Sequence, residues 1–173
     1  MRSRLLSLVV AGALAVAGCA AQRAVGPLEV GLGQTSTEVA RTLRRYDFCA
    51  NGEPDVGRQV FPQCGRPGAV FGDAWVVAHY AGGRTVRVQR FERWADRDRA
   101  TARWGQLVDR RTALGPPSEA ARERVFARQG LPDRIRSWRA FEHGDTLIAI
   151  YLFDVTASTE PAILEEILPL DGP

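Results

Sequence analysis

Apolar and polar positions follow two different periods along this chain, and together they predict a mixed α+β fold. Four segments carry apolar residues every three to four positions, which is typical of helices: residues 36–46, 94–114, 118–129 and 158–168. Residues 73–92 and 135–156 alternate instead, with turns at Gly82-Gly83 and at Gly144, which predicts two β-hairpins. We therefore expect an α+β domain with a four-stranded antiparallel sheet and helices packed on one face.

Local signals refine this outline. Thr35 followed by Glu38 is a capping box, which places the start of the first helix. Residues 147–153 are almost all apolar, which is typical of a strand covered on both faces. Residues 47–72 show no period and are expected to form a long loop.

The two hairpins resemble each other. Trp75 stands seven residues before Gly82 and Trp138 six before Gly144, and each turn is followed by a Gly-x-Thr sequence. Two interpretations remain open: a tandem repeat, or chance similarity between two amphipathic hairpins. Trp75 and Trp138 are the candidate binding residues if they are exposed, and core residues if they are buried.

The N-terminus is typical of an export signal. A basic head containing Arg2 and Arg4 precedes an apolar run, residues 5–17, that is shorter than the ~20 residues a membrane-spanning helix needs. Val16-Ala17-Gly18-Cys19 resembles the bacterial lipobox. This resemblance implies that residues 1–18 are a lipoprotein signal peptide and that Cys19 becomes the lipidated first residue, carrying palmitate. The alternative is an ordinary signal peptide, cleaved near Ala17 or Ala20.

Export also bounds the domains and the location. Residues 19–27 are expected to form a lipidated tether and residues 28–173 one globular α+β domain. Ala20 is not the Asp that resembles an inner-membrane retention signal. We therefore expect anchoring in the bacterial cell envelope, in the outer membrane facing the periplasm.

The cysteine count fits this location. With Cys19 lipidated, Cys49 and Cys64 remain as a pair, and an exported protein encounters conditions in which disulfides persist. A disulfide is therefore expected between them. A metal or redox pair is the alternative, but the spacing is not Cys-x-x-Cys and no His lies near in sequence.

Charge narrows the partners only slightly. All 23 basic residues are Arg, which indicates either a GC-rich genome or a surface for bidentate contacts with phosphate and carboxylate. Removal of residues 1–18 takes away Arg2 and Arg4, so 21 Arg face 20 acidic residues and the net charge is about +1. With an export signal as well, nucleic acid is not an expected partner.

One stretch, Gly31-Leu32-Gly33-Gln34-Thr35-x-x-Glu38-Val39, is similar to the small accessory lipoproteins of the outer-membrane β-barrel assembly machine, the SmpA/OmlA type. The resemblance implies a fold like that of the β-lactamase-inhibitor domain, which also occurs in tandem. The chain departs from that pattern because it lacks the Gly-x-Pro after the helix and inserts the loop between Cys49 and Cys64. No functional residue is carried over.

No catalytic fingerprint is present, and no cofactor or metal is expected. His79 and His143 are the only histidines, one in a strand and one in a turn. We expect a lipid-anchored, non-catalytic binding or scaffolding module that contacts the membrane through Cys19 and binds an envelope protein or peptidoglycan. The alternatives are an envelope hydrolase using His79 or His143, and a carrier of a hydrophobic ligand.

Overall fold

The computed structural model describes residues 30–64, 74–154 and 160–171. The expected signal peptide (residues 1–18), the lipidated Cys19 and the tether (residues 19–27) lie outside the described residues. Within the described part, the protein is an α+β domain with one open antiparallel sheet and three helices, so the predicted fold class is confirmed.

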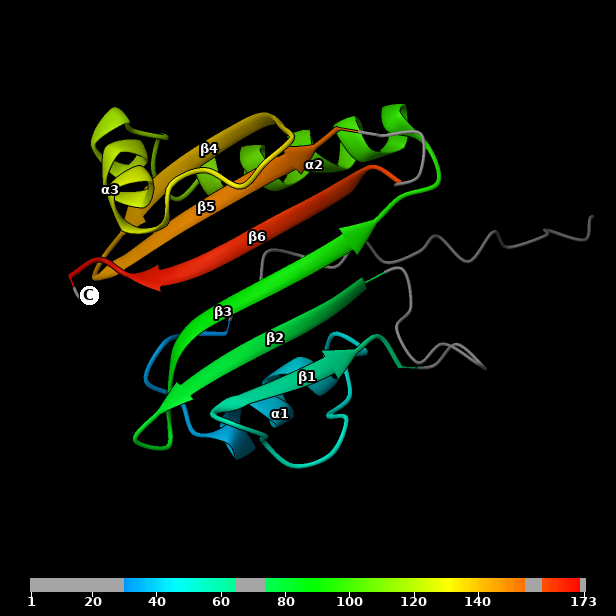
Figure 1. Ribbon diagram of the computed structural model, residues 1–173, viewed down its shortest axis with the longest axis vertical. Helices are drawn as coiled ribbons and strands as arrows, with labels where there is room; N and C mark the ends of the chain where they lie inside the picture. The colour runs from blue at the N-terminus through cyan, green and yellow to red at the C-terminus, as the bar shows by residue number, and fades with distance from the viewer. Residues whose placement is uncertain (1–29, 65–73, 155–159, 172–173) are drawn as a thin grey trace, which may run out of the picture.

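The sheet has six strands rather than the predicted four, in the order β1-β2-β3-β6-β5-β4. In chain order the strands are β1 (Arg58–Pro62), β2 (Ala74–Ala81), β3 (Arg84–Arg93), β4 (Ile135–His143), β5 (Thr146–Phe153) and β6 (Ala162–Pro169). Every neighbouring pair is antiparallel. Figure 1 shows the strands side by side, with α1 near β1 and both α2 and α3 near β4 and β5.

The largest correction is β6, because the helix predicted for residues 158–168 is wrong. This strand lies between β3 and β5, and its positions 163–168 are all buried, so both of its faces need covering. A strand buried on both faces does not alternate, and its apolar residues at 163, 164, 167 and 168 also fit one side of a helix. Strand β1 is the other addition; it has only five residues and falls inside the predicted loop.

The first three predicted helices are confirmed, as α1 (Ser36–Arg44), α2 (Arg97–Thr112) and α3 (Glu119–Gln129). Each begins after a side chain that accepts a hydrogen bond from the backbone three residues later: Thr35, Asp96 and Ser118. The capping box of Thr35 and Glu38 is formed as predicted. Gly130, in a conformation with φ 64°, follows α3.

The helices do not share one face of the sheet, which corrects the predicted arrangement. Helices α1 and α2 pack with one buried cluster, which includes Val39 and Leu107. Helix α3 packs with a second cluster through Ala121 and Val125. We call the two sides of the sheet the α1/α2 face and the α3 face.

The strand order consists of two consecutive three-stranded units, β1-β2-β3 and β4-β5-β6, which meet where β3 pairs with β6. The two predicted hairpins, β2–β3 and β4–β5, therefore do not pair with each other directly, since β6 lies between them. The first hairpin turns at Gly82-Gly83, both with positive φ, as its two-residue turn requires.

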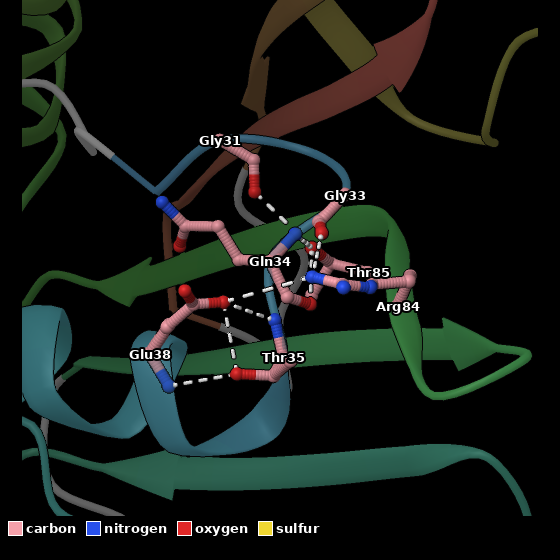
Figure 2. Close-up of polar contacts among 7 residues, drawn as sticks. All are labelled: Gly31, Gly33, Gln34, Thr35, Glu38, Arg84 and Thr85. Atoms are coloured by element: carbon pink, nitrogen blue, oxygen red, sulfur yellow. Dashed lines mark hydrogen bonds and ion pairs between the residues drawn. The ribbon is translucent and has the colours of Figure 1, made fainter.

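The stretch from Gly31 to Glu38 is bound to the end of the β2–β3 hairpin (Figure 2). The backbone N–H of Gly33 donates to the carbonyl of Thr85 at 2.7 Å, and the N–H of Thr85 donates to the carbonyl of Gln34 at 2.8 Å. The Thr85 hydroxyl accepts from the N–H of Gln34 at 2.9 Å. These residues fix the entry into α1, which gives the motif a structural role.

The disulfide between Cys49 and Cys64 is present, as predicted. The loop that it closes lies along the outer edge of β1. The N–H of Cys49 donates to the carbonyl of Pro62 at 3.1 Å, and the N–H of Asn51 donates to that of Val60 at 3.0 Å. The loop therefore shields backbone groups that an edge strand would otherwise expose.

Candidate functional site

One cross-strand row of large apolar side chains runs across the α3 face. It takes one residue from each strand, in the order Pro62, Trp75, Phe91, Leu164, Tyr151 and Trp138. Trp75 and Trp138, the two candidate binding residues, thus lie in the same row on the same face, four strand positions apart. The sequence placed each of them in a hairpin, but only the strand order shows that they share a row.

Each tryptophan stacks on its neighbour and lies under an arginine. The rings of Trp75 and Phe91 are stacked with centroids 5.1 Å apart, and those of Trp138 and Tyr151 are 5.8 Å apart. The guanidinium of Arg93 lies 5.6 Å from the Trp75 ring. On Trp138 the corresponding cation is Arg122, at 4.9 Å, and it comes from α3. Such stacked and cation–π contacts hold the flat rings in fixed orientations.

Helix α3 covers the part of this face formed by β4 and β5. Ala121 and Val125 of the helix pack against strands whose facing side chains are small, Ala140 and Ala149, and all four are fully buried. Tyr151 is buried beside them, and its hydroxyl accepts a hydrogen bond from Gln129 at 3.1 Å. Burial, with the nearby Glu166 carboxylate, raises the pKa of Tyr151. We call this region the covered half.

The part of the same face formed by β1, β2 and β3 is different, since no described helix lies over β1 and β2 on this side. Its side chains are partly exposed: Val60, Pro62, Trp75, Val77, His79, Gln89 and Phe91. Arg58 and Arg93 are exposed at its ends. We call this region the open half.

A group of hydrogen-bonded polar side chains around Glu166, which we call the polar seam, separates the two halves. The Glu166 carboxylate on β6 is 1% exposed and accepts hydrogen bonds from Arg87 Nε at 2.6 Å, Gln89 Nε2 at 2.9 Å and Gln129 Nε2 at 2.6 Å. His79 continues the seam into the open half, with its Nε2 atom 3.1 Å from Oε1 of Gln89. The buried carboxylate is thus engaged with its own neighbours rather than with a ligand.

The exposed charged side chains on the strands of the open half are all arginines. Arg58 and Arg93 are exposed, and Arg87, whose side chain is 37% exposed, pairs with the buried Glu166. Glu166, an acidic side chain on the neighbouring strand β6, is buried. A ligand for the open half would therefore meet apolar side chains flanked by positive charge.

The α1/α2 face carries a second charged cluster, which is buried. Arg103 binds Glu92 through two bonds of 2.9 Å, and Arg111 binds Glu165 at 2.7 Å. Arg90 bridges the two carboxylates, at 3.4 Å from Glu92 and 2.8 Å from Glu165. These contacts join β3 and β6 to α2, so they hold the two three-stranded units together, and all five side chains are buried.

Burial tends to raise the pKa of Glu92, but the hydrogen bond from Arg103 and the charges of Arg90 and Arg103 outweigh it. The pKa of Glu92 therefore lies below its ordinary value. The carboxylate is kept ionised inside the fold, where its arginine partners hold it.

The two histidines are not brought together. His79 is partly buried on β2, and His143 is exposed at the end of β4, with β3, β6 and β5 between those strands. A recess beside His143, lined also by Arg111, Leu114 and Phe141, leaves room for about one water molecule and is too small for an organic ligand.

Two further features bear on sites and on the membrane. In the described ranges, no three His, Cys, Asp or Glu side chains group closely enough to hold a metal ion. Among the same residues, no helix is both long and apolar enough to cross a bilayer.

No protein-family model, curated protein or solved structure matches this chain. The open half is therefore defined by its own geometry. Sequence reasoning identified Trp75 but missed Phe91, Val77 and Arg93, which complete the surface. The alternation of residues 87–93 already places Phe91 on the same side of the strand as Arg87 and Gln89. Which side of the strand stays uncovered depends on the placement of α3.

Proposed function

We propose that this protein is a lipid-anchored, non-catalytic envelope protein that uses the open half of the α3 face to bind another envelope component. The single observation that carries the proposal is the difference between the two halves of one face. A helix covers one half, while the other presents partly exposed Val77, Trp75 and Phe91 between exposed arginines. Apolar patches rimmed by polar residues mark interaction sites on soluble domains.

The lipid anchor is supported by the lipobox-like sequence ending at Cys19. The stretch between Cys19 and Val30, which includes the expected tether of residues 19–27, reaches at most ~35 Å, so a tethered domain would meet partners close to the membrane. The arrangement suits a module that captures or positions a neighbour in the envelope.

The anchor is tested by intact-mass analysis of protein purified from the membranes of its bacterial host. We expect a chain that lacks residues 1–18 and carries acyl chains at Cys19, and loss of both changes in Cys19→Ser. A bare Cys19 in the native protein, or retention of residues 1–18, would contradict the anchor.

The binding face is tested by placing a photoreactive amino acid at Val77, in the open half, and at Ala102, which is exposed on α2. In intact cells we expect a discrete crosslinked adduct from position 77 and none from position 102. If neither position, or both equally, gave adducts, the open half would not be a specific binding face.

We also infer that the domain is built from a repeated unit of a helix followed by three strands. The chain order α1-β1-β2-β3 then α2-α3-β4-β5-β6 supports this inference. Counted outward from the β3–β6 contact, the strands are β3, β2 and β1 on one side and β6, β5 and β4 on the other. In this register β4 corresponds to β1 rather than to β2. Helix α3 is the element that the first unit lacks.

A further inference from the structure

The open half has the width of a helix. Adjacent strands lie ~4.8 Å apart, so the axes of β1 and β3 are about 10 Å apart, and an α-helix with its side chains is ~10–12 Å across. Helix α3 already lies on the same face over β4 and β5. A second helix would therefore fit beside it on the remaining strands, continuing a packing layer that the fold has begun.

The open half presents the apolar side chains that a bound helix would need. The apolar row continues without a break from Tyr151, under α3, through Leu164 to Phe91 and Trp75. Val60 and Val77 form a second apolar pair next to this row. A helix with an apolar stripe would bury these side chains as α3 buries those of the covered half.

The exposed arginines of the open half indicate which charge the binding partner should carry. In the covered half, α3 supplies the guanidinium over Trp138 through its own Arg122. In the open half, the sheet itself supplies the guanidinium over Trp75 through Arg93. Arg58 adds a second exposed cation at the opposite end of this surface. Carboxylates on the occupant would pair with both, since Arg forms bidentate contacts with carboxylates.

Helix α3 rises above the open half, and this difference in height disfavours a planar binding partner such as a membrane. A helix lying on a sheet stands about 10 Å above the strands, so a planar bilayer resting on α3 would not reach Val77 or Phe91. A rod-shaped partner lying beside α3 reaches both. We infer that the open half binds an acidic amphipathic helix of a partner protein, a proposal that rests on the binding function proposed above.

The experiment measures binding of a fluorescent 18-residue peptide to the purified full-length protein in mild detergent. The peptide carries Leu at i, i+3, i+4 and i+7 with Glu and Ala elsewhere, and a matched peptide carries Arg in place of every Glu. We expect the acidic peptide to bind, the basic peptide not to bind, and the affinity of the acidic peptide to fall as salt is raised.

Charge reversal locates the contact. Arg58→Glu with Arg93→Glu should weaken peptide binding about tenfold or more. Arg110→Glu with Arg136→Glu, an equal change of charge at exposed positions outside the open half, should leave the affinity within about twofold. All four sites are exposed, so both variants should keep the circular dichroism spectrum and melting temperature of the parent protein.

Two results would overturn the inference: failure of the acidic peptide to bind, and equal losses in the two double variants. If the peptide does not bind but phosphatidylglycerol vesicles bind through Arg58 and Arg93, the occupant is an anionic lipid surface instead. If the peptide fails while position 77 still crosslinks in cells, the inference falls and the proposed function stands. If both fail, the proposed function falls as well.

Discussion

The covered and open halves of the α3 face share the same sheet and the same rows of side chains, yet among the described residues only one half has a helix over it. In the row next to the aromatic one, the covered half presents Ala149 and Ala140, whereas the open half presents Val77 and Val60. Small side chains allow a helix backbone to approach closely. The difference shows that α3 packs on small side chains in the covered half, whereas the open half presents larger side chains to a partner.

The halves are also joined differently on the two faces. The adjacent residues Glu165 and Glu166 point to opposite sides of β6, and each binds arginine. Glu165 links β3 and α2 in the interior, while Glu166 links β3 to the end of α3. Through these contacts of Glu165 and Glu166, the open half is held rigidly to the covered half.

The largest expected effect comes from the same substitution made in each half. Ala149→Glu would place an unpaired carboxylate under α3 and should destabilise the fold by about 4 kcal/mol. Val77→Glu, in the same row but partly exposed, should cost less than ~1 kcal/mol. Urea unfolding of the two variants measures the difference. Equal losses would mean that the open half is buried in solution and that the comparison is wrong.

Removal of the disulfide tests how the open half is supported at its outer strand. Cys49→Ser with Cys64→Ser should lower the unfolding free energy by about 3 kcal/mol, because the bond closes a loop with a sequence separation of 15. Since the loop lies along β1, hydrogen exchange should rise in β1 and β2 before it rises in β4 and β5. Uniform acceleration across the sheet would contradict this local role.

The seam between the halves should give a smaller effect. Glu166→Ala leaves Arg87, Gln89 and Gln129 without their shared acceptor, at a cost of about 2 kcal/mol. The loss stays moderate because Arg87 is partly exposed and can turn toward water. Amide exchange in α3 should rise as well, and Glu166→Gln, which keeps an acceptor oxygen, should show a weaker form of both changes.

The sequence predicted what local patterns determine and missed what depends on neighbours. The helix cap at Thr35, the turn at Gly82-Gly83 and the cysteine pair all follow from interactions within a few residues or from the export context. Strand β6 could not be identified in this way. Its apolar pattern fits a helix equally well, and only burial between β3 and β5 selects the extended form.

The same limit applies to the candidate site. Trp75 and Trp138 were singled out by residue type, but their common row depends on β6 being inserted between the two hairpins. Phe91 is partly exposed while α3 lies over β4 and β5. Both are consequences of the strand order, which no local pattern in the chain specifies.

Acid should weaken the buried ion pairs on the α1/α2 face. We expect this loss of stability to be the smallest of the four effects. The pKa of Glu92 in the fold is depressed below its ordinary 4.5, so its contribution to stability is present above that value and is lost as the pH falls through the folded pKa. Protonation removes the charge that holds Arg103, which connects α2 to β3, and Arg90, which lies beside Glu92 on β3.

Urea midpoints between pH 6 and pH 3 measure this loss. Glu92→Gln should start from a lower midpoint at pH 6 and then change less with falling pH than the parent protein. Glu38→Gln is the matched control, because the pKa of the exposed Glu38 is also lowered, by hydrogen bonds from Thr35, but Glu38 caps α1 and does not join the halves. A parallel pH slope for Glu92→Gln and the parent protein would show that the Glu92 pairs do not hold the two units together.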